Sequence, residues 1–341
     1  MRFTKYNCMN DILAYPEMLD YLKTLFQEDN LEMIPKAMYH LPLAYVEQHA
    51  VCSWGVPFSA VIDQLLAAVD VILDILDHKS RRCISLWNER CDWTPAKSAG
   101  GKKESVFLLS PTPRQERFLY KKSKRPAVII CPGGAYERVC FSGEGNPVLQ
   151  FMEAKGYGAF VLNYRVAPNA YPAPQEDLAL AIRYVRNHAE EYEIDPENLM
   201  LMGFSAGGHL CASMGALYHQ FEDTSVSLRP NKICLGYPVI SCIKECHEDS
   251  VQNLTNGDET LKYKLSVERL VTPDYPKTFL WTCADDSCVP PSNSVRFAKA
   301  LETAGVLHQF ELYPAGEHGC NLAFATSAAG WSQEMIQYFH E

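Results

Sequence analysis

The sequence contains no apolar run long enough to cross a membrane. Its most apolar window, residues 61–76, is interrupted by three aspartates and a glutamine, whereas a membrane-spanning helix needs about 20 consecutive apolar residues. The N-terminal segment, residues 1–7, lacks the apolar stretch and the small-residue cleavage site of a secretory signal. We therefore expect that the protein does not bind or span a membrane and that it is cytoplasmic.

Positive charge is scarce. Lys and Arg number 31 against 41 Asp and Glu, which gives a formal net charge of −10. The basic clusters, Arg81-Arg82 and residues 121–125, are short, and a nucleic-acid surface would need a basic stripe or patch. The composition therefore argues against nucleic-acid binding. Apolar residues make up 47% of the chain and charged residues 21%, a balance typical of globular domains.

The cysteines do not form a pattern of disulfides or of metal ligands. There are 13, an odd number, and no two are spaced as Cys-x-x-Cys. In a chain of 341 residues this favours reduced thiols over a disulfide framework. Cys242, Cys246 and His247 lie close together but lack a fourth ligand at a recognisable spacing. We expect neither a metal ion nor an organic cofactor.

The chain divides into two regions that differ in the pattern of their apolar residues. In residues 1–96, apolar positions recur at helical spacing and prolines separate the segments, which predicts several helices. Residues 97–103 are small and polar and resemble a linker. Residues 104–341 alternate short apolar runs with longer helical patterns. We interpret them as one catalytic domain.

The alternation in the second region predicts the α/β class, with a mostly parallel sheet that helices cover on both faces. The first two strands are expected to form a hairpin. The strand candidates are residues 106–109, 117–120, 127–131, 159–164, 199–202, 233–239, 278–283 and 309–313. The helical stretches between them lie near residues 145–155, 175–193, 206–219, 292–304 and 328–340. In such sheets the functional site lies at the carboxyl ends of the strands.

A candidate nucleophile follows the strand at residues 199–202. The segment Gly203-Phe204-Ser205-Ala206-Gly207 is a Gly-x-Ser-x-Gly motif with a predicted strand before it and a predicted helix after it. The turn is so sharp that only glycine avoids a steric clash two residues before and after the serine. The alternative is a simple strand-to-helix turn in which the serine caps the helix.

A serine nucleophile needs a base and an orienting carboxylate. His318, flanked by Gly316 and Gly319, follows the strand at residues 309–313 and is the candidate base. Asp285 and Asp286 both follow the strand at residues 278–283, and the residues alone do not decide between them. The order Ser…Asp…His along the chain goes with one fold.

Backbone donors for an oxyanion hole are expected after the strand at residues 127–131. Glycine lets the backbone approach a substrate carbonyl closely, and Gly133 and Gly134 stand there together. We assign one N–H group to Gly133 or Gly134, and a second to Ala206, which follows the nucleophile.

These motifs, with others around them, resemble the α/β-hydrolase superfamily. The similarity is greatest to a branch of bacterial esterases and lipase-like enzymes that includes acetylxylan and feruloyl esterase-type proteins. It covers about residues 104–341. The segments that carry it are Cys131-Pro132-Gly133-Gly134-Ala135-Tyr136, Val161-Leu162-Asn163-Tyr164-Arg165-Val166, residues 171–177 with Ala181-Ile182, residues 271–281, and Gly316-Glu317-His318-Gly319.

The resemblance implies an α/β-hydrolase fold with Ser205, Asp286 and His318 as the triad. The family's aspartate stands three residues before the Val of a Val-Pro pair, and here that position is Asp286. One departure is Ala135, which replaces the usual third glycine and adds a methyl group at the oxyanion hole.

The expected activity is hydrolysis of carboxylic esters through an acyl-enzyme. The resemblance favours short acyl groups, above all acetyl groups on carbohydrates such as xylan-derived oligosaccharides. Tyr136 and Trp281 could then stack on sugars. The alternatives are a serine peptidase, an acyltransferase, a general short-chain lipase-like esterase, or a binding protein on an inactive scaffold.

Residues 1–96 match no part of the family. They could form a cap over the site, a dimerisation surface or a docking module for a partner, so the sequence leaves a homo-oligomer open. The segment 241–266 is a second candidate for covering the site.

Overall fold

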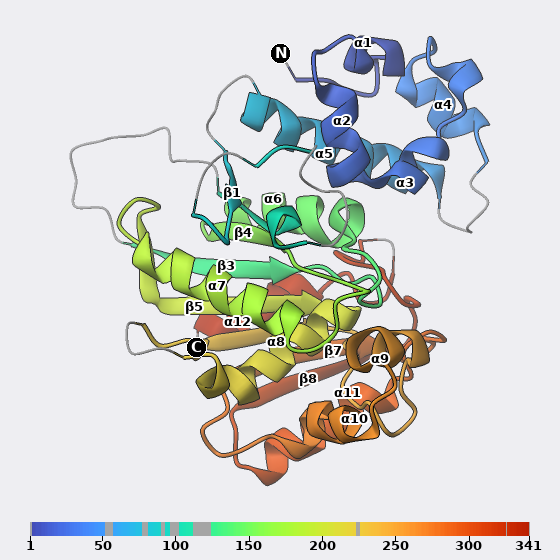
Figure 1. The fold of residues 1–341 in the computed structure, drawn as a ribbon. Coiled ribbons are helices and arrows are strands. Elements are labelled where there is room, and N and C mark those ends of the chain that lie inside the picture. The colour runs from blue at the N-terminus through green and yellow to red at the C-terminus, as the bar shows by residue number, and fades with distance from the viewer. Residues whose placement is uncertain are drawn as a thin grey trace.

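The computed structural model describes residues 2–51, 57–76, 81–89, 93–95, 102–111, 124–222, 226–324 and 326–340. Its centre is an eight-stranded sheet (Figure 1). In spatial order the strands are β1 (Cys83–Ser85), β2 (Phe107–Leu109), β4 (Gly158–Asn163), β3 (Arg125–Cys131), β5 (Ile194–Phe204), β6 (Lys232–Gly236), β7 (Lys277–Cys283) and β8 (His308–Tyr313).

The sheet is parallel from β4 through β8 and antiparallel at the β1–β2 edge. The predicted α/β class is therefore confirmed. The central strands read as continuous apolar runs because both of their faces are covered, and every residue of β7 after Lys277 is buried. The second strand of the expected hairpin, residues 117–120, lies outside the described residues; β2 pairs instead with β1 and β4.

Helices cover both faces of the sheet. In Figure 1, α7 and α8 lie in front of the strands and α12 lies behind them. The helical elements of this region are η4 (Lys103–Ser105), η5 (Phe141–Gly145), α6 (Asn146–Ala154), α7 (Ala173–Asn187), α8 (Ser205–Leu217), η6 (Tyr218–Gln220), α9 (Glu248–Thr255), α10 (Glu259–Leu265), η7 (Val267–Arg269), α11 (Ser292–Thr303) and α12 (Trp331–His340). Within the described part of the chain, none of the helices is long and apolar enough to span a membrane.

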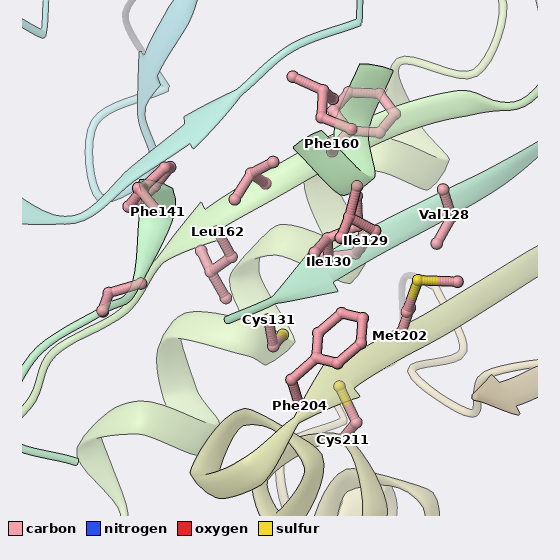
Figure 2. Packing of buried hydrophobic residues seen from close by; sticks show 14 of the residues in the cluster. Val128, Ile129, Ile130, Cys131, Phe141, Phe160, Leu162, Met202, Phe204 and Cys211 are labelled. Atoms are coloured by element: carbon pink, nitrogen blue, oxygen red, sulfur yellow. The ribbon is translucent and has the colours of Figure 1, made fainter. Parts of the chain in front are cut away.

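Apolar side chains from neighbouring strands interlock to form the core around the site. Burying one large apolar side chain contributes about 1.5–3 kcal/mol to stability. This cluster therefore stabilises the strands whose ends carry the site. Figure 2 labels ten of its members, which are Val128, Ile129, Ile130, Cys131, Phe141, Phe160, Leu162, Met202, Phe204 and Cys211.

The N-terminal region is helical as predicted, except that it also supplies β1 to the edge of the sheet. Its helices lie at the top of Figure 1, where α5 packs on η5 and α6 and η1 packs on η5. They are α1 (Met9–Leu13), α2 (Met18–Leu22), η1 (Lys23–Gln27), α3 (Glu28–Glu32), η2 (Lys36–Met38), α4 (Leu43–His49) and α5 (Phe58–Leu76).

Buried contacts fix this region to the sheet-bearing part. The Asn146 side chain donates a buried 2.7 Å hydrogen bond to the Leu25 carbonyl, and Arg81 pairs with Glu153 at 2.8 Å. The apolar residues of both parts belong to one buried cluster. Most of the predicted linker, residues 97–101, lies outside the described residues, and the division into domains stays a prediction.

Candidate active site

The turn from β5 into α8 holds Ser205 in a left-handed conformation, with φ +51°. A non-glycine residue adopts such a φ only where the surrounding structure holds it there. The flanking glycines make the turn possible, because a Cβ atom at Gly203 would overlap the Gly207 carbonyl and one at Gly207 would overlap the Cys131 carbonyl. The steric reason expected from the sequence thus applies at both positions.

Ser205, His318 and Asp286 lie together in one hydrogen-bonded chain. His318 Nε2 is 2.9 Å from Ser205 Oγ, and His318 Nδ1 is 2.8 Å from Asp286 Oδ2. Because a carboxylate only accepts, the proton on Nδ1 is donated to Asp286, which leaves Nε2 of the neutral ring to accept from the serine hydroxyl. The arrangement lets Ser205 transfer its proton to the ring as its oxygen attacks.

The two adjacent aspartates have different partners. Asp286 is 5% exposed and its second oxygen accepts the N–H groups of Cys288 and Val289, at 3.0 and 2.9 Å. Asp285 accepts the N–H groups of Gly316 and Glu317, both at 3.0 Å. Asp286 therefore orients the His318 ring, and Asp285 holds the loop on which that ring stands.

The structure corrects the expectation for the oxyanion donors at Gly133. The Gly133 N–H group donates a 2.6 Å hydrogen bond to Glu144 Oε2 and is not available to a substrate. Gly134 lines the cleft beside Ser205, and Ala206 stands in the first turn of α8, where N–H groups have no partner within the helix. Gly134 and Ala206 are thus the candidate donors that are left from the sequence analysis.

The loop after β3 is an unusual turn. Gly134, Ala135 and Tyr136 all have positive φ, at +120°, +57° and +55°. A side chain at Gly134 would overlap the Arg138 carbonyl, so glycine is required there. Ala135, in place of the usual glycine, takes the left-handed conformation, and its carbonyl accepts a 2.9 Å hydrogen bond from Asn253 of α9. The segment 241–266 therefore contacts the loop after β3 that carries Gly134.

Tyr136 and Trp281 cannot stack on a sugar, and the expectation that they would is wrong. They are 1% and 0% exposed. The His209 ring donates through Nε2 to the Leu265 carbonyl at 2.8 Å, so its Nδ1 accepts from the Tyr136 hydroxyl at 2.9 Å. Trp281 stacks on Trp331 with ring centroids 5.1 Å apart. Both aromatic side chains belong to the core beneath the site.

Glu144, which sequence reasoning missed, is buried next to the triad. Its second oxygen, Oε1, accepts the Tyr237 hydroxyl at 2.8 Å, and the Tyr237 ring packs edge-on against His318, with centroids 4.8 Å apart. Burial raises the pKa of Glu144, while the bonds from Gly133 and Tyr237 and the nearby His318 act in the opposite direction. Its signal in the sequence is weak, because it is a single acidic residue in residues 141–145.

A cleft of about 480 Å³ opens over Ser205 and His318. Part of its wall comes from the N-terminal region, through η1, α3 and α5. The other residues come from the loops after β3, β6, β7 and β8, from η5, and from the first turns of α8 and α9. The polar lining includes Gln27, Asp29, Asn30, Gln64, Glu137, Arg138, Ser142, Glu144, His247, Asp249 and Asn321.

Known proteins resemble this chain in sequence and in fold. The family model for BD-FAE matches residues 119–301. The chain belongs to the BD-FAE family.

A solved acetyl ester-xyloside bifunctional hydrolase from Caldicellulosiruptor lactoaceticus is 36% identical with a TM-score of 0.66, over 76% of this chain and 95% of that one. A carboxylesterase from Lactobacillus plantarum is 27% identical with a TM-score of 0.61, over 69% and 92% of the two chains. The expected α/β-hydrolase fold is confirmed.

Two curated relatives are much longer than the matched part. Endo-1,4-beta-xylanase B of Butyrivibrio fibrisolvens is 35% identical over 221 residues, which are 61% of this chain and 34% of that protein. The acetylxylan esterase of Xylanibacter ruminicola is 30% identical over 209 residues, which are 59% of this chain and 42% of that protein. This BD-FAE chain thus spans less than half the length of either relative.

Proposed function

We propose that this chain is a serine hydrolase of carboxylic esters that works through an acyl-enzyme. The observation that carries the proposal is the 2.9 Å distance from Ser205 Oγ to His318 Nε2, with Asp286 at 2.8 Å from the other ring nitrogen. In this role Ser205 is the nucleophile and His318 the general base. Asp286 fixes the tautomer of the ring and stabilises the imidazolium that forms.

The reaction follows in two halves. Ser205 Oγ attacks the ester carbonyl while its proton moves to His318 Nε2, and the N–H groups of Gly134 and Ala206 donate to the oxyanion. Each such donor contributes about 3–4 kcal/mol in comparable sites. His318 then protonates the leaving alcohol, and water, activated by the same ring, releases the acid from Ser205. Apart from the ester and water, the groups that these steps use are side chains and backbone N–H groups of the chain.

Turnover of 4-nitrophenyl acetate by the wild type and by Ser205→Ala tests this mechanism. The variant is expected to lose turnover and labelling by a fluorophosphonate probe, because both need the hydroxyl. Ser227→Ala, a change at an exposed serine, is the matched control and is expected to retain both. Equal activity in Ser205→Ala and the wild type would overturn the assignment of the nucleophile.

We infer that the preferred esters are short-chain, above all acetyl esters of carbohydrates. The names of the relatives from Xylanibacter ruminicola and Caldicellulosiruptor lactoaceticus, which refer to acetylxylan and to an acetyl ester with a xyloside, support this inference. Acetate release from acetylated xylo-oligosaccharides is expected to exceed hydrolysis of long-chain fatty esters. A clear preference for long acyl chains would refute it and favour a lipase-like esterase.

A cytoplasmic location stays a prediction. It is supported by the thiols, because all eleven cysteines in the described ranges are free and free thiols persist in reducing compartments. A homo-oligomer likewise stays open.

A further inference from the structure

The N-terminal region forms one wall of the cleft over Ser205. Gln27 ends η1, Asn30 lies in α3 and Gln64 lies in α5, and all three line the cleft. The family model begins only at residue 119. This wall therefore lies outside the segment that the family model matches, and it borders the cleft over Ser205.

Hydrogen bonds hold the wall in place against η5. The Asn30 side chain donates to Ser142 Oγ at 2.7 Å and to the Phe26 carbonyl at 2.9 Å. Ser142 Oγ in turn donates to Gln27 Oε1 at 3.1 Å. A wall fixed before the substrate arrives needs little ordering on binding, and this improves affinity.

The wall presents three carboxamides, those of Gln27, Asn30 and Gln64, and one carboxylate, that of Asp29. The carboxamide nitrogens of Gln64 and Asn321 both lie near Gly143, 3.7 and 3.5 Å from where its Cβ would stand. A carboxamide offers two donors and an oxygen acceptor, a set that suits the hydroxyl groups of a sugar. The Arg138 guanidinium, which also lines the cleft, pairs with Asp29 at 3.4 Å, and this pairing reduces its attraction for an anionic substrate.

The volume of the cleft is larger than an acetyl group requires. An acetyl group fills only a small part of about 480 Å³, a volume within the range of complete ligand sites. The triad and the N-terminal wall border the same cleft, so the rest of this space can hold the alcohol part of the ester.

We propose that Gln64, with Gln27, Asn30 and Asn321, forms a subsite for a neutral, hydroxyl-rich alcohol group, such as a sugar ring, in the ester that Ser205 attacks. The proposal rests on the proposed esterase function. It gives the N-terminal region a direct role in substrate selection, as a fixed wall of the site.

The test compares kcat/KM for an acetylated xylo-oligosaccharide with kcat/KM for 4-nitrophenyl acetate. Gln64→Met keeps the length of the side chain but removes its hydrogen bonds. The ratio of the two constants is expected to fall about tenfold, as for the loss of a hydrogen bond to substrate. Gln64→Asn, which keeps the amide but shortens the side chain, is expected to lie between Gln64→Met and the wild type. Gln333→Met, the same substitution at an exposed position of α12, is expected to leave the ratio unchanged.

The outcomes separate the two proposals. An unchanged ratio in both Gln64 variants would overturn the subsite, and so would a wild type that hydrolyses the aryl acetate but not the oligosaccharide. A wild type that hydrolyses neither substrate would instead overturn the esterase function itself.

Discussion

Glu144 Oε2 accepts the backbone N–H group of Gly133 at 2.6 Å, and this bond joins a buried carboxylate to the loop that carries Gly134, one of the two proposed oxyanion donors. The other oxygen of Glu144 accepts the Tyr237 hydroxyl, which itself accepts the Asn321 N–H group at 3.0 Å. One carboxylate thus connects the loop after β3 with the loop that follows His318. Both hydrogen bonds suit the ionised form, since each oxygen accepts.

Glu144→Gln is expected to lower kcat about 10- to 100-fold with little change in KM. The amide keeps one acceptor but replaces the other with an NH₂ group that would face a donor, so the loop before Gly134 shifts. Hydrogen bonds to charged groups contribute about 1.5–3 kcal/mol, which corresponds to rate changes of this size. Steady-state kinetics on 4-nitrophenyl acetate measure both constants.

Glu190→Gln, at an exposed position, is the control for the same substitution and is expected to match the wild type. If Glu144→Gln retained full kcat, Glu144 would serve the fold alone and not the alignment of the donors.

The adjacent aspartates are expected to respond very differently to the same change. Asp286→Asn removes the carboxylate that fixes the tautomer of His318, and comparable changes in serine hydrolases lower kcat about 10⁴-fold. Asp285→Asn keeps an oxygen that can accept the N–H groups of Gly316 and Glu317, so its kcat is expected to fall no more than about tenfold. Single-turnover hydrolysis of 4-nitrophenyl acetate compares the two. Equal losses would show that both residues act only through the position of the loop.

Local signatures in the sequence predict two of the three residues that the structure brings together, Ser205 and His318. Ser205 stands in a Gly-x-Ser-x-Gly turn, and His318 and Asp286 follow predicted strands whose carboxyl ends meet at one edge of the sheet. The choice of Asp286 over Asp285 came from the family resemblance, and the partners of each residue explain it.

The features of the site that could not be predicted from the sequence depend on contacts between segments far apart along the chain. Whether Gly133 donates to a substrate or to the protein depends on Glu144, whose place is set by the packing of η5. Tyr136 and Trp281 are aromatic residues near the motifs, and nothing local distinguishes a buried ring from an exposed one. The approach of Gln64 to the cleft likewise results from the packing of α5 on η5 and α6.

Protonation of His209 is expected to destabilise the protein in acid. Burial lowers the pKa of His209 from 6.5 to about 4. The unfolded chain therefore binds more protons than the folded one between these two values, and the free energy of unfolding falls as the pH decreases from 6.5 towards 4. For one such group the loss is about 3 kcal/mol. Urea unfolding of the wild type and of His209→Gln between pH 4 and 7 measures it.

His209→Gln can still accept from Tyr136 and donate to the Leu265 carbonyl, but it does not titrate. Its free energy of unfolding is expected to depend less on pH than that of the wild type over this interval. His340→Gln, which alters a histidine at the exposed end of α12, is expected to keep the steeper dependence. Identical pH dependence in all three proteins would show that His209 does not resist protonation.

Gly207→Ala is expected to lower the free energy of unfolding by about 3 kcal/mol or more. Its Cβ atom would overlap the carbonyl oxygens of Cys131 and Pro132, and these belong to the backbone of β3 and the oxyanion loop, which cannot yield without moving the sheet or α8. Gly143→Ala is the matched control, because its Cβ atom would make only ordinary contacts, the nearest at 3.5 Å. Urea unfolding of both variants measures the difference. A Gly207→Ala protein as stable as Gly143→Ala would mean that α8 can move away from β3, so that the close approach at the nucleophile turn is not required by the fold.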